Sequence, residues 1–227
     1  MNYELDYLIG KAKIRTRSIP ELLEQEKVFS PGNPKAAFVT TYFWRMFLRE
    51  RNIKGQENLE RAASAYSPED PLTVAVRHGS DIDTQFLEQA LRFGGAKEFA
   101  NKAVYVAGLN MNERGYIRIN TLGGNRIFVE TPLIMDDLKE VLSDKTKEIP
   151  SRNLLEQLMG YGTRLNYAAG YEVKGARSRG QPIVVYPEAT RSPDGFIKKA
   201  HPSTGFYFTE GITLPVMIRG SEKFLPP

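Results

Sequence analysis

The feature that most constrains the fold is an alternation of short apolar runs with amphipathic stretches after residue 70. Runs rich in β-branched and aromatic residues predict strands at residues 72–76, 103–107, 127–130, 182–186 and 212–218. Helical periodicity connects several of them, at residues 83–93, 135–142 and 151–167. Strands that alternate with helices in this way predict an α/β fold, layered, with a largely parallel sheet flanked by helices.

The first 66 residues have a different pattern and read as helical. Ser18, Pro20 and Glu21 form an N-cap signature, which predicts that a short helix begins at this point. After a break at residues 32–34, a second helix is predicted over residues 35–51. We therefore predict an N-terminal helical segment at residues 1–66 and an α/β domain at residues 67–227.

The predicted helix at residues 35–51 carries an aromatic face that has two interpretations. Packing onto the sheet is the commoner fate of such a face, and we favour it because Thr40 and Thr41 share the helix and the helix is short. The alternative is that its aromatic and basic side chains lie in a membrane interface. No apolar run reaches the roughly 18 residues of a spanning helix, and the first residues lack a secretory signal. We expect a cytoplasmic protein, or one peripheral to the inner face of the membrane.

Composition excludes several kinds of site. The chain contains no cysteine, which excludes disulfides, thiolate nucleophiles and cysteine zinc sites. It contains only two histidines, so we expect no metal site. The 31 basic and 27 acidic residues give a net charge of +4, which mildly favours anionic partners such as phosphorylated metabolites or lipid headgroups. Nucleic acid is not an expected partner.

His78 follows the predicted strand at residues 72–76 and precedes a helix, a position suited to proton transfer. Its catalytic use requires a carboxylate that fixes its tautomer, and Asp81 and Asp83 are both candidates. Asp81 is also suited to cap the helix, so spacing alone does not choose between them. A structural histidine with two capping aspartates is an equally good interpretation of this segment alone.

A second group of polar residues follows the predicted strand at residues 182–186. Within five positions it places the carboxylate of Glu188, the hydroxyls of Thr190 and Ser192, and the guanidinium of Arg191. The planar guanidinium suits a phosphate or a carboxylate.

Together these segments resemble the glycerolipid acyltransferases, which acylate glycerol 3-phosphate and lysophosphatidic acid. The family's first motif has an aspartate five residues after its histidine, matched by His78 and Asp83. Its third motif, Phe-Pro-Glu-Gly-Thr-Arg-Ser, is matched by residues 186–192, and its fourth, a proline-containing strand, by residues 214–218. The resemblance implies that His78 is the general base, that Asp83 orients it, and that Glu188, Thr190, Arg191 and Ser192 shape the acceptor site.

The resemblance further implies transfer of a fatty acyl group from a thioester donor, acyl-CoA or acyl carrier protein, to a hydroxyl of a phosphorylated or lyso-lipid acceptor. No cofactor beyond the donor is expected. Arg77 replaces the family's asparagine and Ala189 its glycine. The second motif is only approximated, because Glu130 and Thr131 occupy the end of the strand where the family has an arginine that helps to hold the acceptor phosphate. Arg126 is a candidate substitute, although it lies at the other end of that strand.

Two other functions are compatible with the same residues. Arg-His-Gly after a strand also begins the histidine phosphatases, in which the histidine is phosphorylated; His201 would then be the second histidine. That family places the motif near its N-terminus, unlike this chain, and residues 186–192 have no role in it. The altered motifs are also compatible with a non-catalytic protein that binds an acyl thioester or a lipid.

Overall fold

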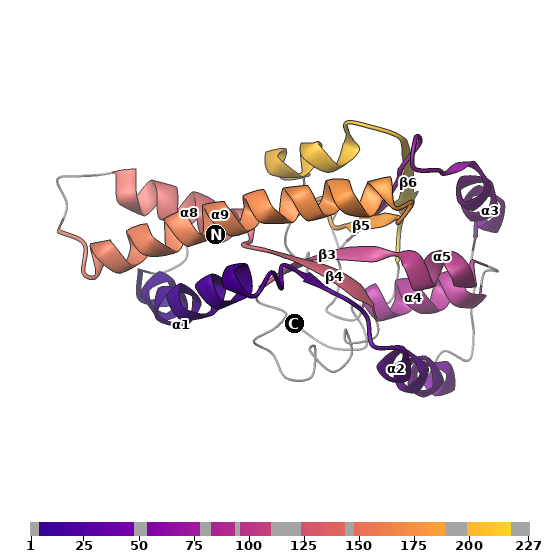
Figure 1. The fold of residues 1–227 in the computed structure, drawn as a ribbon, viewed down its shortest axis with the longest axis horizontal. Coiled ribbons are helices and arrows are strands. Elements are labelled where there is room, and N and C mark those ends of the chain that lie inside the picture. Colours follow the sequence, from indigo (N-terminus) through magenta and orange to yellow (C-terminus); the bar gives the residue numbers. More distant parts are fainter. Residues whose placement is uncertain are drawn as a thin grey trace.

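The computed structural model describes residues 5–47, 54–77, 83–93, 96–109, 124–143, 148–188 and 199–218. Within these ranges the chain has a mixed α/β fold with a six-stranded sheet and eight helices (Figure 1). The predicted α/β class, the largely parallel sheet and the presence of a helix at the N-terminus are confirmed. None of the helices in the described ranges has the length and apolarity needed to cross a membrane.

All five predicted strands are present in the sheet. The spatial order is β1-β4-β3-β5-β2-β6, and every pair is parallel except β1 with β4. The strands are β1 Phe29–Ser30, β2 Leu72–Val76, β3 Val104–Gly108, β4 Asn125–Val129, β5 Ile183–Val185 and β6 Ile212–Val216. The two-residue strand β1 was not predicted, because its length gives no periodic signal.

The predicted short helix after Ser18 is wrong. Helix α1 (Leu5–Glu24) runs through Ser18 without a break and contains Pro20 in its last turns. It continues because a row of side chains at helical spacing, Leu8, Ala12, Arg15 and Ile19, is fully buried along it. Burial against the rest of the protein therefore outweighs the local capping signal.

Helix α2 (Pro34–Phe47) confirms the predicted second helix, and Asn33 caps it by accepting from the backbone amides of Lys35 and Ala36 at 3.0 and 3.3 Å. Its buried side chains are small, Ala37 and Thr40, whereas the aromatic side chains described on it are exposed. The packing interpretation is therefore wrong for these aromatic side chains.

The remaining helices extend or supplement the prediction. Helix α9 continues eleven residues beyond the predicted end at 167, because Ala169, Val173 and Ala176 prolong its buried row. Helices α5 and η1 were not predicted. The bounds are α3 Gln56–Ala65, α4 Asp83–Phe93, α5 Lys97–Lys102, α8 Pro132–Ser143, α9 Arg152–Ser178 and η1 Pro202–Phe208.

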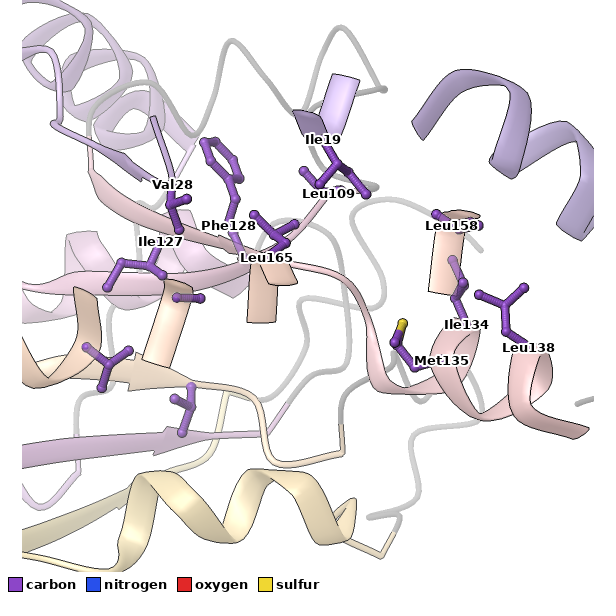
Figure 2. Close-up of a cluster of buried hydrophobic side chains, with 14 of the residues drawn as sticks. Ile19, Val28, Leu109, Ile127, Phe128, Ile134, Met135, Leu138, Leu158 and Leu165 are labelled. Atoms are coloured by element: carbon purple, nitrogen blue, oxygen red, sulfur yellow. The ribbon is translucent and has the colours of Figure 1, made fainter. Parts of the chain in front are cut away.

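Two hydrophobic clusters hold the fold together. The larger joins α1, α8 and α9 to β3, β4 and β5, and Figure 2 shows Leu158 of α9 beside Ile134 and Leu138 of α8. The smaller joins α3, α4 and α5 to β2, β3 and β5. Successive residues of β5 enter different clusters, Ile183 the larger and Val184 the smaller, as expected of a strand buried on both sides.

Candidate active site

Three segments that carry the motifs lie side by side in the sheet. Strand β2 pairs in parallel with β5 on one side and with β6 on the other, so the carboxyl ends of all three meet at one edge. Ala75 is level with Val185 and with Pro215. The amide of Arg77, which directly precedes His78, donates to the carbonyl of Val216 at 3.1 Å. In parallel sheets this edge is where binding sites form.

Asp83 is the first residue of α4, and its side chain is fully buried beside this edge. The next residue, Thr84, hydrogen bonds through its hydroxyl to the Tyr186 hydroxyl at 2.6 Å. Desolvation of its phenol raises the pKa of Tyr186, the bond to Thr84 partly opposes the rise, and the charge of Asp83 adds to it. The start of α4 and the end of β5 are thus in direct contact.

Glu188 lies in the turn after β5 and is buried. The preceding Pro187 carbonyl accepts the backbone amide of His201 at 2.8 Å and the Thr204 hydroxyl at 3.4 Å. These bonds fix the turn to the start of η1. His78, Asp81, Thr190, Arg191 and Ser192 lie outside the described residues, so the structure brings Asp83 and Glu188 to this edge and does not place the other five.

No family model and no curated protein matches the sequence. The interpretation of this edge therefore depends on the residues themselves. The feature that stands out is the hydrogen bond between Thr84 and Tyr186, which joins two segments 102 positions apart. Those two segments are the ones in which the sequence analysis found its first and third motifs.

Arg126 does not lie at this edge. It is the second residue of β4, level with Tyr105 of β3, which is in turn level with Val184 of β5. Two strand spacings, about 10 Å, separate it laterally from β5. Its side chain is buried, with the guanidinium 5.4 Å from the centre of the Phe128 ring and 3.4 Å from the Ser30 hydroxyl. Its use as an acceptor ligand remains a prediction.

An ion pair lies at the end of β4, where the glycerolipid acyltransferases have an arginine. Glu130 and Arg15 of α1 are both fully buried, and the Arg15 guanidinium binds the Glu130 carboxylate. The same carboxylate accepts the amide of Thr131 at 2.8 Å, and Asn166 of α9 hydrogen bonds to the Glu130 backbone. Glu130 therefore joins α1 and α9 to the end of β4, and its charge is neutralised from within the protein.

A buried polar group on α4 was missed by the sequence analysis. Its members from the helix are Thr84, Gln85, Glu88 and Gln89, none more than 8% exposed. Tyr105 of β3 belongs to the same group, because its buried hydroxyl is close enough to Glu88 to be affected by the charge of that carboxylate. Burial and this charge raise the pKa of Tyr105 well above the ordinary value. Glu88 itself is paired with Arg92 at 2.8 Å. No local signal in the sequence reveals this group, because glutamine and glutamate at such spacing normally mark the exposed side of an amphipathic helix.

The amide oxygens of Gln85 and Gln89 and the hydroxyl of Tyr105 are buried without a hydrogen-bond partner in the part of the chain that the structure describes. Such atoms are usually satisfied by ordered water or by a ligand. In the same ranges, no three His, Asp or Glu side chains lie close enough together to hold a metal ion. The described residues thus bring carboxylates, hydroxyls and amides to this edge.

The contact between Thr84 and Tyr186 makes a measurable contribution to stability. Tyr186→Phe removes one hydroxyl and leaves that of Thr84 without its partner, so we expect the free energy of unfolding to fall by about 1 kcal/mol. Thr84→Val should cost a similar amount. The double variant should lose less than the sum of the two single variants, because both single changes remove the same bond. Urea denaturation measures all three, and strictly additive losses would contradict the contact.

Proposed function

We propose that the protein is an O-acyltransferase that moves a fatty acyl group from acyl-CoA or acyl carrier protein to a hydroxyl of a glycerolipid-type acceptor. His78 removes the proton from the acceptor hydroxyl, and the resulting oxygen nucleophile attacks the carbonyl carbon of the thioester. The tetrahedral intermediate collapses with cleavage of the C–S bond. The proton taken by His78 passes to the departing sulfur, so the products are an ester and a free thiol.

In this proposal Asp83 accepts a hydrogen bond from the His78 ring and stabilises the imidazolium that forms during the reaction. The observation that carries the proposal is the contact of Thr84 with Tyr186. It holds the carboxylate at the start of α4 against the segment that leads into the third motif, as a shared site requires. The full burial of Asp83 strengthens its electrostatic effect on a charge that develops beside it.

Glu188, Thr190, Arg191 and Ser192 shape the acceptor site in this proposal, with Arg191 as the anion clamp. The guanidinium of Arg15 is paired with the Glu130 carboxylate, so this ion pair at the end of β4 contributes no net positive charge to the acceptor site. Acceptors with a small anionic group or none are therefore favoured over those with a dianionic phosphate. We further propose a layered arrangement in which helices cover both faces of the sheet. We also propose that the protein is located in the cytoplasm, peripheral to the membrane.

Release of free thiol tests this function directly. Purified protein is supplied with acyl-CoA or acyl carrier protein and with one acceptor from a panel of phosphorylated glycerols, lyso-lipids and amino alcohols. Thiol release that depends on the acceptor, with formation of the corresponding ester, supports the proposal. Binding of the thioester without thiol release would instead indicate a non-catalytic protein, and an acid-labile phosphohistidine would indicate a phosphatase.

A further inference from the structure

Helix α2 presents three large apolar side chains to solvent among those that the structure describes. Phe38, Val39 and Tyr42 are 73, 65 and 62% exposed, and Lys35, one turn earlier, is exposed as well. These four residues are spaced i, i+3, i+4 and i+7, so they form one continuous stripe over two turns. We call this stripe the α2 face. The same spacing normally marks the buried side of a helix.

The opposite side of α2 is the one that packs on the protein. Its buried residues are Ala37 and Thr40, and the helix packs against α4. Figure 1 shows α2 at the lower edge of the view, beyond α4. Among the side chains that the structure describes on α2, those facing inward are small or polar, and Phe38, Val39 and Tyr42 face solvent as one apolar stripe. An exposed apolar stripe of this kind points to an external partner for the α2 face.

We propose that the α2 face binds the surface of a lipid bilayer that contains anionic lipids. An amphipathic helix with aromatic and basic residues and no acidic residue lies in such an interface with its apolar side chains among the acyl chains. Residues 34–47 include Lys35 and Arg45 and no aspartate or glutamate. The inference deepens the proposed function and rests on it for the choice of a lipid, because glycerolipid acceptors and acyl chains are found in membranes.

Charge and area both favour a bilayer over a second copy of the chain. A symmetric contact between two α2 faces would bury the Lys35 ammonium of both copies without an acidic residue of either helix to pair with it. Two aromatic side chains and a valine supply at most about 150–250 Å² each. That falls short of the roughly 800 Å² that each partner contributes to a stable protein interface, whereas insertion into lipid needs no such area.

Helix α9 provides a matched control surface. Tyr167 and Tyr171 are 72 and 74% exposed, one turn apart on that helix. Their neighbours on the exposed side of α9 are polar or charged, such as Arg164 and Lys174. Phe206 of η1, 39% exposed, lies beside Gly170 between them and is left unchanged in the control. Replacement of these two tyrosines therefore removes as many exposed aromatic rings as replacement of Phe38 and Tyr42, without an effect on the α2 face.

Co-sedimentation of the full chain with vesicles tests the inference. The vesicles are made of phosphatidylcholine, with and without phosphatidylglycerol, and no substrate is added. We expect binding to the anionic vesicles, weakened about 100- to 1000-fold by the triple change Phe38→Ser, Val39→Ser and Tyr42→Ser. The single change Phe38→Ser should weaken it by roughly tenfold, and Lys35→Gln by about fivefold on anionic vesicles only. The double change Tyr167→Ser and Tyr171→Ser should have no effect.

Three results would overturn the inference: no binding by the unaltered protein, equal binding by the α2 variants, or equal loss in the α9 control. Sedimentation velocity tests the rival occupant, a second copy of the chain. A dimer that dissociates in the α2 variants would assign the α2 face to that second copy. Thiol release with a short-chain, water-soluble donor and acceptor is measured on the same variants without vesicles. It should be unchanged, so that failure of membrane binding and failure of the proposed function are distinguished.

Discussion

His78→Ala is expected to reduce the rate of acceptor-dependent thiol release by about 10²- to 10⁴-fold, because the variant lacks the group that removes the proton from the acceptor hydroxyl. The loss should appear mainly in kcat, since a general base acts in the transition state more than in substrate binding. In acid the unaltered enzyme should lose activity, because only the neutral imidazole can take the proton of the acceptor hydroxyl. The residual rate of the variant should lack this dependence.

Asp83→Asn tests the second half of the same mechanism. Asparagine has the shape of the buried carboxylate but no charge, so the variant keeps the packing at the start of α4 and loses the stabilisation of the imidazolium. We expect a loss comparable to that of His78→Ala, and little further loss when the two changes are combined, because the residues act as a unit. Losses that multiply in the double variant would contradict the pairing of His78 with Asp83.

The second histidine provides the control for both variants. His201 precedes η1, where its ring is 2.8 Å from the Asp136 carboxylate and 2.9 Å from the Ser203 hydroxyl. These contacts are structural, so His201→Gln should keep thiol release within about threefold of the unaltered enzyme. If His78→Ala also stays within that range, His78 is not the general base. If His201→Gln alone abolishes activity, the assignment of the two histidines must be exchanged.

The strands after residue 70 were predictable from the sequence because each is a compact apolar run. Burial on both sides makes such runs nearly continuous, as in β2, where Leu72, Thr73, Val74 and Val76 are all buried. Helix ends were less predictable. The Ser18 signature indicated a helix start, yet α1 passes through it, because the buried row from Leu8 to Ile19 is decided by contact with α9, far away in sequence.

The candidate site was likewise predictable only in part. Parallel topology and the position of polar residues after β2 and β5 predict His78 and Glu188 at one edge of the sheet. The structure bears this out for Glu188 and brings Asp83 to the same edge, while His78 lies outside the described residues. The buried polar group on α4 was not predictable in this way, because Gln85 and Gln89 are residues that usually remain in water. The partner of Glu130 was also hidden, since Arg15 is 115 positions away and nothing in the local pattern connects them.

The buried ion pair of Arg15 with Glu130 gives the largest expected effect on stability. Arg15→Met keeps the length of the side chain but leaves the Glu130 carboxylate without its guanidinium partner in a fully buried position. Removal of one member of a buried ion pair costs about 3–5 kcal/mol, because the desolvated charge is no longer compensated. Urea denaturation should therefore show a fall of this size in the free energy of unfolding.

Glu130→Gln in the Arg15→Met background should recover at least half of that loss. The amide is neutral, so no buried charge remains, and its oxygen can still accept the hydrogen bond from the Thr131 amide. The exposed pair of Lys139 with Asp136, 3.3 Å apart, gives the matched control, and Lys139→Met should cost less than about 1 kcal/mol. If the double variant is as unstable as Arg15→Met alone, the loss does not come from an uncompensated charge on Glu130. Arg15 would then stabilise the protein through packing and not through the ion pair.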